Sequence, residues 1–152
     1  MSHKLNYGCG KDIKEGWENL DVIAHKGADI VRDFKRGIPR NDNYYKEILA
    51  QYSLTQIVDA EDFTFVINEF YRVLKKGGVL TIVVPDANAP DSDSYNDPRD
   101  QRYFTRATFD YFNIDHPYRW SEFSYGYLPW HIIEIKSERT NRLKALMTPA
   151  NK

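Results

Sequence analysis

The feature that most constrains the fold is a helical segment followed directly by a β-branched run. Apolar residues recur with helical spacing over residues 58–76, and residues 78–85 are almost all β-branched or apolar. Asp59 is suited to cap the start of this helix and Gly77 to end it. A buried strand reached from a helix in this way is typical of a right-handed crossover in a parallel sheet. The unit therefore predicts the α/β fold class.

Shorter apolar runs bounded by Gly, Pro, Asp or Asn predict the remaining strands. They cover residues 4–7, 19–23, 28–31 and 46–52. A short helix is expected over residues 105–113, and residues 130–137 and 141–148 are expected to form a hairpin, with a helix as the alternative for its second arm. The prediction is one domain over residues 1–152, with a doubly wound, mostly parallel Rossmann-like sheet and a C-terminal antiparallel hairpin.

Charge and cysteine content exclude several classes of protein. The 21 basic and 22 acidic residues give a net charge of −1, which argues against a domain that binds nucleic-acid backbones. Cys9 is the one cysteine and the four histidines are scattered, so neither a disulfide nor a metal cluster is expected. No apolar run approaches the roughly 20 residues of a membrane helix, and the first residues do not resemble a signal peptide. We expect a cytoplasmic protein.

A glycine turn, Gly8-Cys9-Gly10, directly follows the first expected strand. Doubly wound sheets bring their backbone close to nucleotide-like ligands at this point, although a tight strand-exit turn is the alternative interpretation. Ile13 interrupts the dinucleotide fingerprint, and Asp21 follows Gly10 by 11 residues rather than about 20. Both departures disfavour a nicotinamide-dependent oxidoreductase. They favour an adenosine ligand without phosphates.

Acidic residues end two further strands at the same expected edge of the sheet. Asp21 ends the second strand, where a carboxylate is suited to ribose hydroxyls; a solvated turn is the alternative. Asp33 ends the third segment, is followed by Phe34, and can accept a hydrogen bond from an adenine amino group. Three strand ends therefore converge on one predicted ligand cleft.

Five segments in order along residues 4–86 carry a resemblance to a known family. They read Leu5-Asn6-Tyr7-Gly8-Cys9-Gly10, then Gly16-Trp17-Glu18-Asn19-Leu20-Asp21, then Ala28-Asp29-Ile30-Val31-Arg32-Asp33, and finally Glu69-Phe70-Tyr71-Arg72-Val73-Leu74-Lys75-Lys76-Gly77-Gly78 with Val83-Val84-Pro85-Asp86. The set resembles class I S-adenosylmethionine-dependent methyltransferases, in particular compact members whose glycine loop reads L-N-x-G-C-G. The resemblance implies that fold, S-adenosylmethionine as cofactor, and methyl transfer to a small molecule or a sugar hydroxyl.

The resemblance also implies a set of cofactor-binding residues. The set comprises Tyr7, Gly8, Cys9, Gly10, Asp21, Asp33, Phe34, Gln51 and Tyr52. Within it, the glycine turn would line the methionine part, Asp21 would hold the ribose, and Asp33 with Phe34 would contact the adenine. The last two residues would face the methionine moiety and the methyl group. Residues 4–86 would form the cofactor half, and residues 87–152 the acceptor side.

The chain departs from the family pattern where acids are common. Asn6 stands where many members carry an acidic residue, and Leu54-Thr55-Gln56 stands where related sequences often read L-E-H. An oxygen acceptor usually needs a base within hydrogen-bond reach. The candidates are Asp86, His116 and His131, with a turn cap, an exposed loop and hairpin packing as their respective alternatives. A catalytically degenerate module that binds S-adenosylmethionine or a partner is the alternative function.

Loops and aromatic residues dominate the second half of the chain. Residues 86–98 are rich in Asp, Asn, Pro and Ser, and a loop of this length indicates a functional role. Twelve of the 22 aromatic residues lie between Tyr95 and Trp130. These rings are candidates for an acceptor pocket or for a homo-oligomer surface over residues 95–130. A second small core is the alternative.

Overall fold

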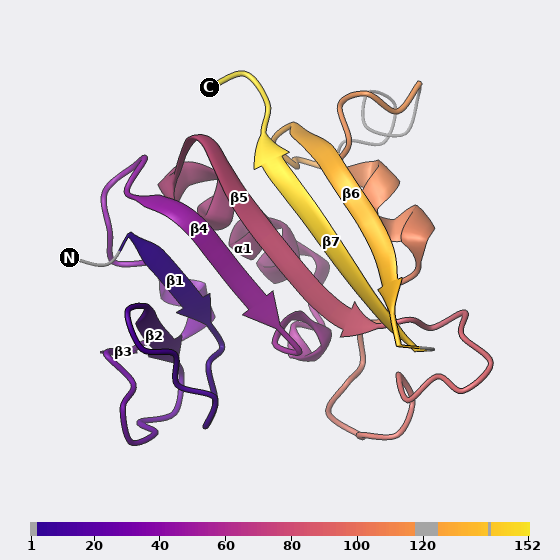
Figure 1. The fold of residues 1–152 in the computed structure, drawn as a ribbon, viewed down its shortest axis with the longest axis horizontal. Coiled ribbons are helices and arrows are strands. Elements are labelled where there is room, and N and C mark those ends of the chain that lie inside the picture. Colours follow the sequence, from indigo (N-terminus) through magenta and orange to yellow (C-terminus); the bar gives the residue numbers. More distant parts are fainter. Residues whose placement is uncertain (1–2, 118–124, 140) are drawn as a thin grey trace.

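A computed structural model describes residues 3–117, 125–139 and 141–152. Its strands form one seven-stranded sheet with the order β3-β2-β1-β4-β5-β7-β6 (Figure 1). The strands are β1 (Lys4–Tyr7), β2 (Glu18–Asp21), β3 (Ile30–Val31), β4 (Tyr45–Gln51), β5 (Leu74–Pro85), β6 (Trp130–Glu138) and β7 (Arg142–Pro149). Strand β7 lies antiparallel to both its neighbours, β5 and β6, and all other pairs are parallel. The predicted α/β sheet and its antiparallel terminal hairpin are confirmed.

Helix α1 (Ala60–Val73) is the crossover between β4 and β5. Asp59 caps it as predicted, because its side chain accepts a hydrogen bond from the backbone N–H of Asp62 at 2.9 Å. The helix ends earlier than its expected stop at Gly77, since Leu74 already has extended backbone and pairs with Tyr45 of β4. No helix in the described ranges is long and apolar enough to cross a membrane.

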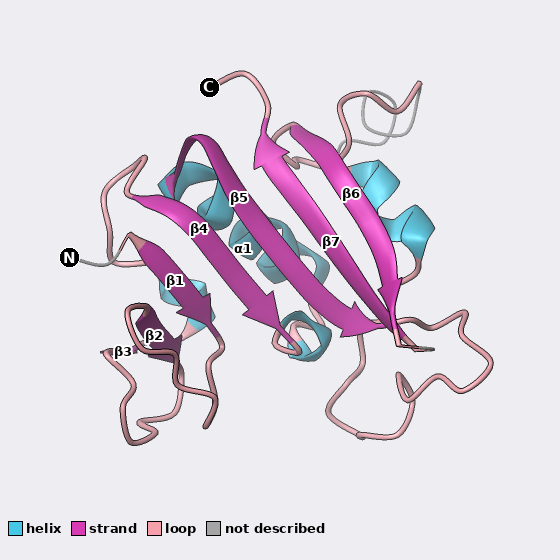
Figure 2. Ribbon diagram, in the orientation of Figure 1, coloured by secondary structure: helices cyan, strands magenta, loops and turns pink. Residues whose placement is uncertain are grey.

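The helices of the described residues lie on one face of the sheet (Figure 2). Besides α1, they are the short 3-10 helices η1 (Phe34–Arg36), η2 (Leu54–Gln56) and η3 (Arg106–Tyr111). A doubly wound sheet carries helices on both faces, but here residues 8–17 and 22–29 connect β1 to β2 and β2 to β3 without one. These connections are shorter than the dozen or more residues of an ordinary helical crossover. The opposite face therefore has no helical layer in the described part of the chain.

The hydrophobic core lies between α1 and the face of the sheet that α1 covers. Alternate residues of β5 point into it, as the 2-residue period of a strand requires. Four rings of the aromatic segment, Phe104, Phe109, Phe112 and Trp130, are at most 1% exposed and belong to the same core. These four are therefore unavailable for self-association. Tyr118, Trp120 and Phe123 of that segment lie outside the described residues.

Candidate functional site

A cavity of about 670 Å³ opens at the carboxyl ends of β1, β2 and β4. This volume falls in the roughly 300–1,000 Å³ range of small-molecule sites. Eight of the nine residues expected to bind a cofactor line it, namely Tyr7, Gly8, Cys9, Gly10, Asp21, Phe34, Gln51 and Tyr52. The parallel sheet brings these distant segments together at one edge.

The ninth expected residue, Asp33, is placed outside the cavity wall. Its carboxylate accepts a hydrogen bond from the backbone N–H of Lys35 at 2.9 Å and so caps η1. Its side chain is exposed, whereas the following residue, Phe34, lines the cavity. Within the Asp33–Phe34 pair, the structure therefore brings only the ring to the site.

The two glycines of the turn serve different purposes. Gly8 has φ +67°, and a Cβ there would lie 2.3 Å from the Cβ of Ser53, so close packing against the residues after β4 requires glycine. Gly10 has φ +52°, and a Cβ there would meet nothing within 4 Å. The backbone at Gly10 is therefore open to the cavity, as the close approach of a cofactor requires.

Asp21 joins the end of β2 to the glycine turn. One carboxylate oxygen accepts a hydrogen bond from the N–H of Gly10 at 2.8 Å, and the other accepts one from the N–H of Ile23 at 3.0 Å. Each oxygen keeps acceptor capacity for another donor. Two adjacent acceptor oxygens held by backbone groups suit the paired hydroxyls of a ribose.

Burial keeps two further residues of the cavity wall in their neutral forms. Burial and the charge of Asp21 raise the pKa of the Cys9 thiol. Burial, together with the charges of Asp33, Glu69 and Asp21, raises the pKa of Tyr7. Both side chains therefore present uncharged groups to a ligand at neutral pH.

The hydrogen bonds of Asn6 explain why an amide stands where related sequences often have an acid. Its amide nitrogen donates hydrogen bonds to the backbone oxygen of Asp12 at 2.8 Å and to the side-chain oxygen of Asn19 at 2.9 Å. Both asparagines are only 3% exposed. An ionised acid at position 6 has no proton to donate to these acceptors. The amide thus suits the connection between β1 and β2, which contains no helix and is held in place by side-chain hydrogen bonds.

The end of the cavity next to β4 contains residues that sequence analysis did not single out. Ser53 lies against Gly8, and its buried hydroxyl has no hydrogen-bond partner among the described residues. Arg99, from the long loop after β5, also lines the cavity. The composition of the loop that contains Arg99 indicated a functional role, but no local sequence pattern marked Ser53 or Arg99.

Comparison with known proteins now adds to this geometry. No protein-family profile matches the chain, and no curated protein sequence matches it. Solved structures do match. A Burkholderia thailandensis 1,6-didemethyltoxoflavin-N1-methyltransferase with bound 1,6-didemethyltoxoflavin and S-adenosylhomocysteine superposes with a TM-score of 0.69 at 9% identity, over 97% of this chain and 71% of that one. The chain has the class I methyltransferase fold.

Two further structures show how widely this fold is used. An S-adenosylmethionine-dependent methyltransferase from Aquifex aeolicus superposes with a TM-score of 0.65 at 13% identity, over 97% of this chain and 81% of that one. The [4+2]-cyclase SpnF superposes with a TM-score of 0.64 at 14% identity, over 96% of this chain and 73% of that one. One fold therefore accompanies different activities, and function must be argued from the site.

The three candidate bases lie at two different edges of the sheet. Asp86 follows β5 at the edge that carries the cavity, where its carboxylate accepts a hydrogen bond from the N–H of Asn88 at 3.0 Å. His131 is the second residue of β6 and pairs with Thr148 near the end of β7, which is the opposite edge of the sheet. Its ring contacts Asp115 at 2.7 Å. None of the three candidates lines the cavity.

His116 belongs to the same distant edge as His131. The backbone just before it, at Asn113, forms a bridge with Trp130 at the start of β6. Its Nε2 lies 3.7 Å from a carboxylate oxygen of Asp110. Neither histidine is therefore placed to reach an acceptor in the cavity. The described residues also contain no group of side chains that can hold a metal ion.

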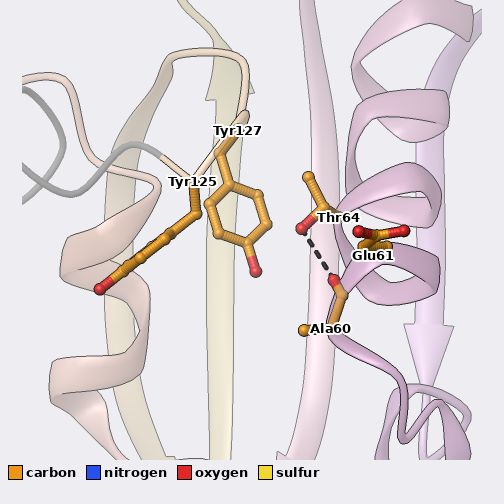
Figure 3. A pocket seen from close by; sticks show the side chains of 5 residues that line it. All are labelled: Ala60, Glu61, Thr64, Tyr125 and Tyr127. Atoms are coloured by element: carbon orange, nitrogen blue, oxygen red, sulfur yellow. Dashed lines mark hydrogen bonds between the residues drawn. The ribbon is translucent and has the colours of Figure 1, made fainter.

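A second, shallower hollow of about 480 Å³ lies beside the first turn of α1 (Figure 3). Its lining consists of Ala60, Glu61, Thr64, Tyr125 and Tyr127. The hydroxyl of Thr64 donates to the backbone oxygen of Ala60 at 2.9 Å, so it is already satisfied. This hollow shares no lining residue with the cavity at the strand ends.

Proposed function

We propose that the protein is an S-adenosylmethionine-dependent methyltransferase acting on a small-molecule acceptor. The observation that carries this proposal is the joined unit of glycine turn and Asp21 at one wall of the cavity. The open Cβ direction at Gly10 and the two acceptor oxygens of Asp21 fit the backbone approach and the ribose of that cofactor.

The cofactor, when bound, supplies a methyl group activated on a sulfonium. Asp21 accepts hydrogen bonds from the ribose hydroxyls, and Phe34 contacts the adenine. Residues 7–10 line the methionine part, and Gln51 and Tyr52 border the methyl end. Asp33 is omitted from the proposed set because its carboxylate caps η1 outside the cavity.

Methyl transfer depends above all on the alignment of acceptor, methyl and sulfur. Among the three candidate bases, Asp86 alone lies at the edge of the sheet where an acceptor arrives. We therefore keep Asp86 as the base for a hydroxyl acceptor. An acceptor with a free nitrogen lone pair needs no base before transfer, and it is served by the same cavity.

Calorimetric titration of the full chain with S-adenosylhomocysteine tests the binding claim. We expect one molecule to bind and the melting temperature to rise, because a ligand that binds only the folded state stabilises it. NAD⁺ serves as the control and should give neither effect. No heat and no melting shift at millimolar S-adenosylhomocysteine would overturn the proposal.

A binding module without turnover is the second candidate function. It is favoured by Leu54-Thr55-Gln56, which lacks the acid and histidine common in related sequences. Formation of S-adenosylhomocysteine from S-adenosylmethionine with pooled sugars and small metabolites separates the two candidates. Binding without turnover supports the module, and acceptor-dependent turnover supports the enzyme.

A further inference from the structure

Tyr52 has an unusual backbone conformation at the methyl end of the cavity. Its φ is +56°, which is unfavourable for a residue with a Cβ and is commonly retained where function needs it. Its side chain lines the cavity and is 44% exposed. The chain therefore leaves β4 in a way that directs an aromatic ring to the cavity instead of to the core.

Arg142 holds this ring from behind. It is the first residue of β7, and its Nε donates a hydrogen bond to the Tyr52 hydroxyl at 3.1 Å. Its guanidinium carbon also lies 5.2 Å from the centre of the Tyr52 ring. The same guanidinium donates through Nη1 to Asp93 at 2.7 Å. One planar cation thus contacts the cavity wall and the long loop together, which the single ammonium of a lysine does less well.

The loop over residues 87–104 is fastened to the rest of the molecule at both its ends. The backbone N–H of Ala87, the first loop residue, donates to the backbone oxygen of Phe104, the last one, at 2.9 Å. Shortly before Phe104, the backbone N–H groups of Gln101 and Arg102 both donate to the backbone oxygen of Thr55 at 3.0 Å. Between these points, residues 88–97 are joined to the hairpin of β6 and β7 by described hydrogen bonds from the side chains of Arg142 and Asn141. The Asn141 bond, to the oxygen of Asp91, is longer at 3.3 Å.

We propose that Arg142 is a positioning residue for the acceptor side of the site, an inference that rests on the proposed methyltransferase function. It fixes Tyr52 at the methyl end and, through Asp93, fastens the middle of the loop to it. The Asp93 side chain is 34% exposed, so solvent partly screens this ion pair and its own contribution to stability is small. A ligand that orders Tyr52 therefore also orders residues 88–97, and cofactor binding prepares the acceptor side.

Amide hydrogen exchange of the full chain, with and without saturating S-adenosylhomocysteine, tests this coupling. In the unmodified protein we expect several-fold slower exchange both in the glycine turn, residues 8–12, and in residues 88–97. In Arg142→Gln the response of the turn should persist and that of residues 88–97 should disappear. Arg142→Lys should rescue only part of it, and Tyr52→Phe should weaken it because the hydroxyl acceptor is lost.

Arg106→Gln is the matched control, because Arg106 also ties a loop-side segment to the hairpin but makes its described hydrogen bonds to residues outside the cavity wall. It donates to the oxygen of Ile135 at 2.8 Å and to the hydroxyl of Ser137 at 3.1 Å. The ligand response of residues 88–97 should be unchanged in this variant. If Arg142→Gln does not fold, Asp93→Ala removes the acceptor of this connection while leaving Arg142 on Tyr52.

The outcomes separate this inference from the proposed function. Protection of both segments by S-adenosylhomocysteine in Arg142→Gln, or in Asp93→Ala, would overturn the role of Arg142 and leave cofactor binding intact. Protection of the turn alone in the unmodified protein would also overturn it. No protection anywhere, together with a silent titration, would remove the proposed function and this inference with it.

Discussion

The carboxylate of Asp21 accepts a hydrogen bond from the backbone N–H of Gly10 at 2.8 Å. This contact joins two sequence signals, the glycine turn after β1 and the acid at the end of β2, into one wall of a cavity. Because the second carboxylate oxygen is held by the N–H of Ile23, the group has a fixed orientation. A ligand therefore meets an acceptor pair that is already in place.

Asp21→Ala should weaken S-adenosylhomocysteine binding by roughly 1–3 kcal/mol, the cost of a lost charged hydrogen-bond partner. Calorimetry measures the change directly. Asp12→Ala is the control, since Asp12 also lines the cavity but its side chain is 66% exposed and paired with Lys14. Equal affinities of Asp21→Ala and the unmodified protein would show that the ribose is bound elsewhere.

Gly8→Ala and Gly10→Ala should fail in different ways. A methyl group at Gly8 collides with Ser53 and also adopts a left-handed backbone, so we expect a loss of stability in urea unfolding that exceeds the backbone cost by about 1–3 kcal/mol. A methyl group at Gly10 enters open space, so its stability cost should be limited to the roughly 1–2 kcal/mol of a left-handed backbone. The Gly10 variant should instead lose cofactor affinity. Normal binding by Gly10→Ala would contradict a close backbone approach there.

Asn6→Asp should destabilise the fold although it restores the acid typical of related sequences. The new carboxylate would face the oxygens of Asp12 and Asn19 in place of a donor, at a cost of about 1–3 kcal/mol. Thermal unfolding measures this loss. Asn96→Asp adds the same charge on an exposed loop residue and should change little. A neutral effect of Asn6→Asp would mean that the loop is held by other contacts.

Glu69 should give the protein an acid-sensitive contribution to stability. Burial acts to raise the pKa of Glu69, but hydrogen bonds from Arg72 and from the N–H of Ile38 hold it below its ordinary value of 4.5. A carboxylate with a lowered folded-state pKa stabilises the fold above its unfolded pKa, and this contribution is lost as the pH falls through the folded value.

Unfolding free energies measured from pH 7 to pH 3 test this role. Glu69→Gln should lose about 1–3 kcal/mol at pH 7 and show a flatter decline below pH 4.5 than the unmodified protein. Glu47→Gln is the control, because Glu47 forms an exposed pair with Lys4 and should leave the slope unchanged. Parallel curves for Glu69→Gln and the unmodified protein would exclude the predicted linkage.

Local patterns predicted much of the structure of residues 4–86. The first strand is found at its predicted residues, Lys4–Tyr7, and Asp59 caps the long helix. The glycine turn and Asp21 reach one cavity because parallel strands end at a common edge. These features depend on periodicity, capping and turn chemistry, each of which acts over a few neighbouring residues.

The contacts of Tyr52 and Arg142 were less accessible to sequence analysis because they join distant segments. Tyr52 and Arg142 are 90 residues apart in sequence, and Asp93 lies in a loop between them. Likewise, the placement of His116 and His131 at the far edge follows from the direction in which β6 enters the sheet. No local sequence pattern specifies the direction in which β6 enters the sheet.

The sequence by itself determined the strand and helix segments, the left-handed glycine turn and the acid at the end of β2, since short-range sterics and hydrogen bonds specify them. Only the tertiary structure decided which residues share the cavity, which face of the sheet receives the helices, and which candidate base follows a strand at the edge that carries the cavity. These outcomes follow from strand order and register, which are set by pairing and burial across the whole chain.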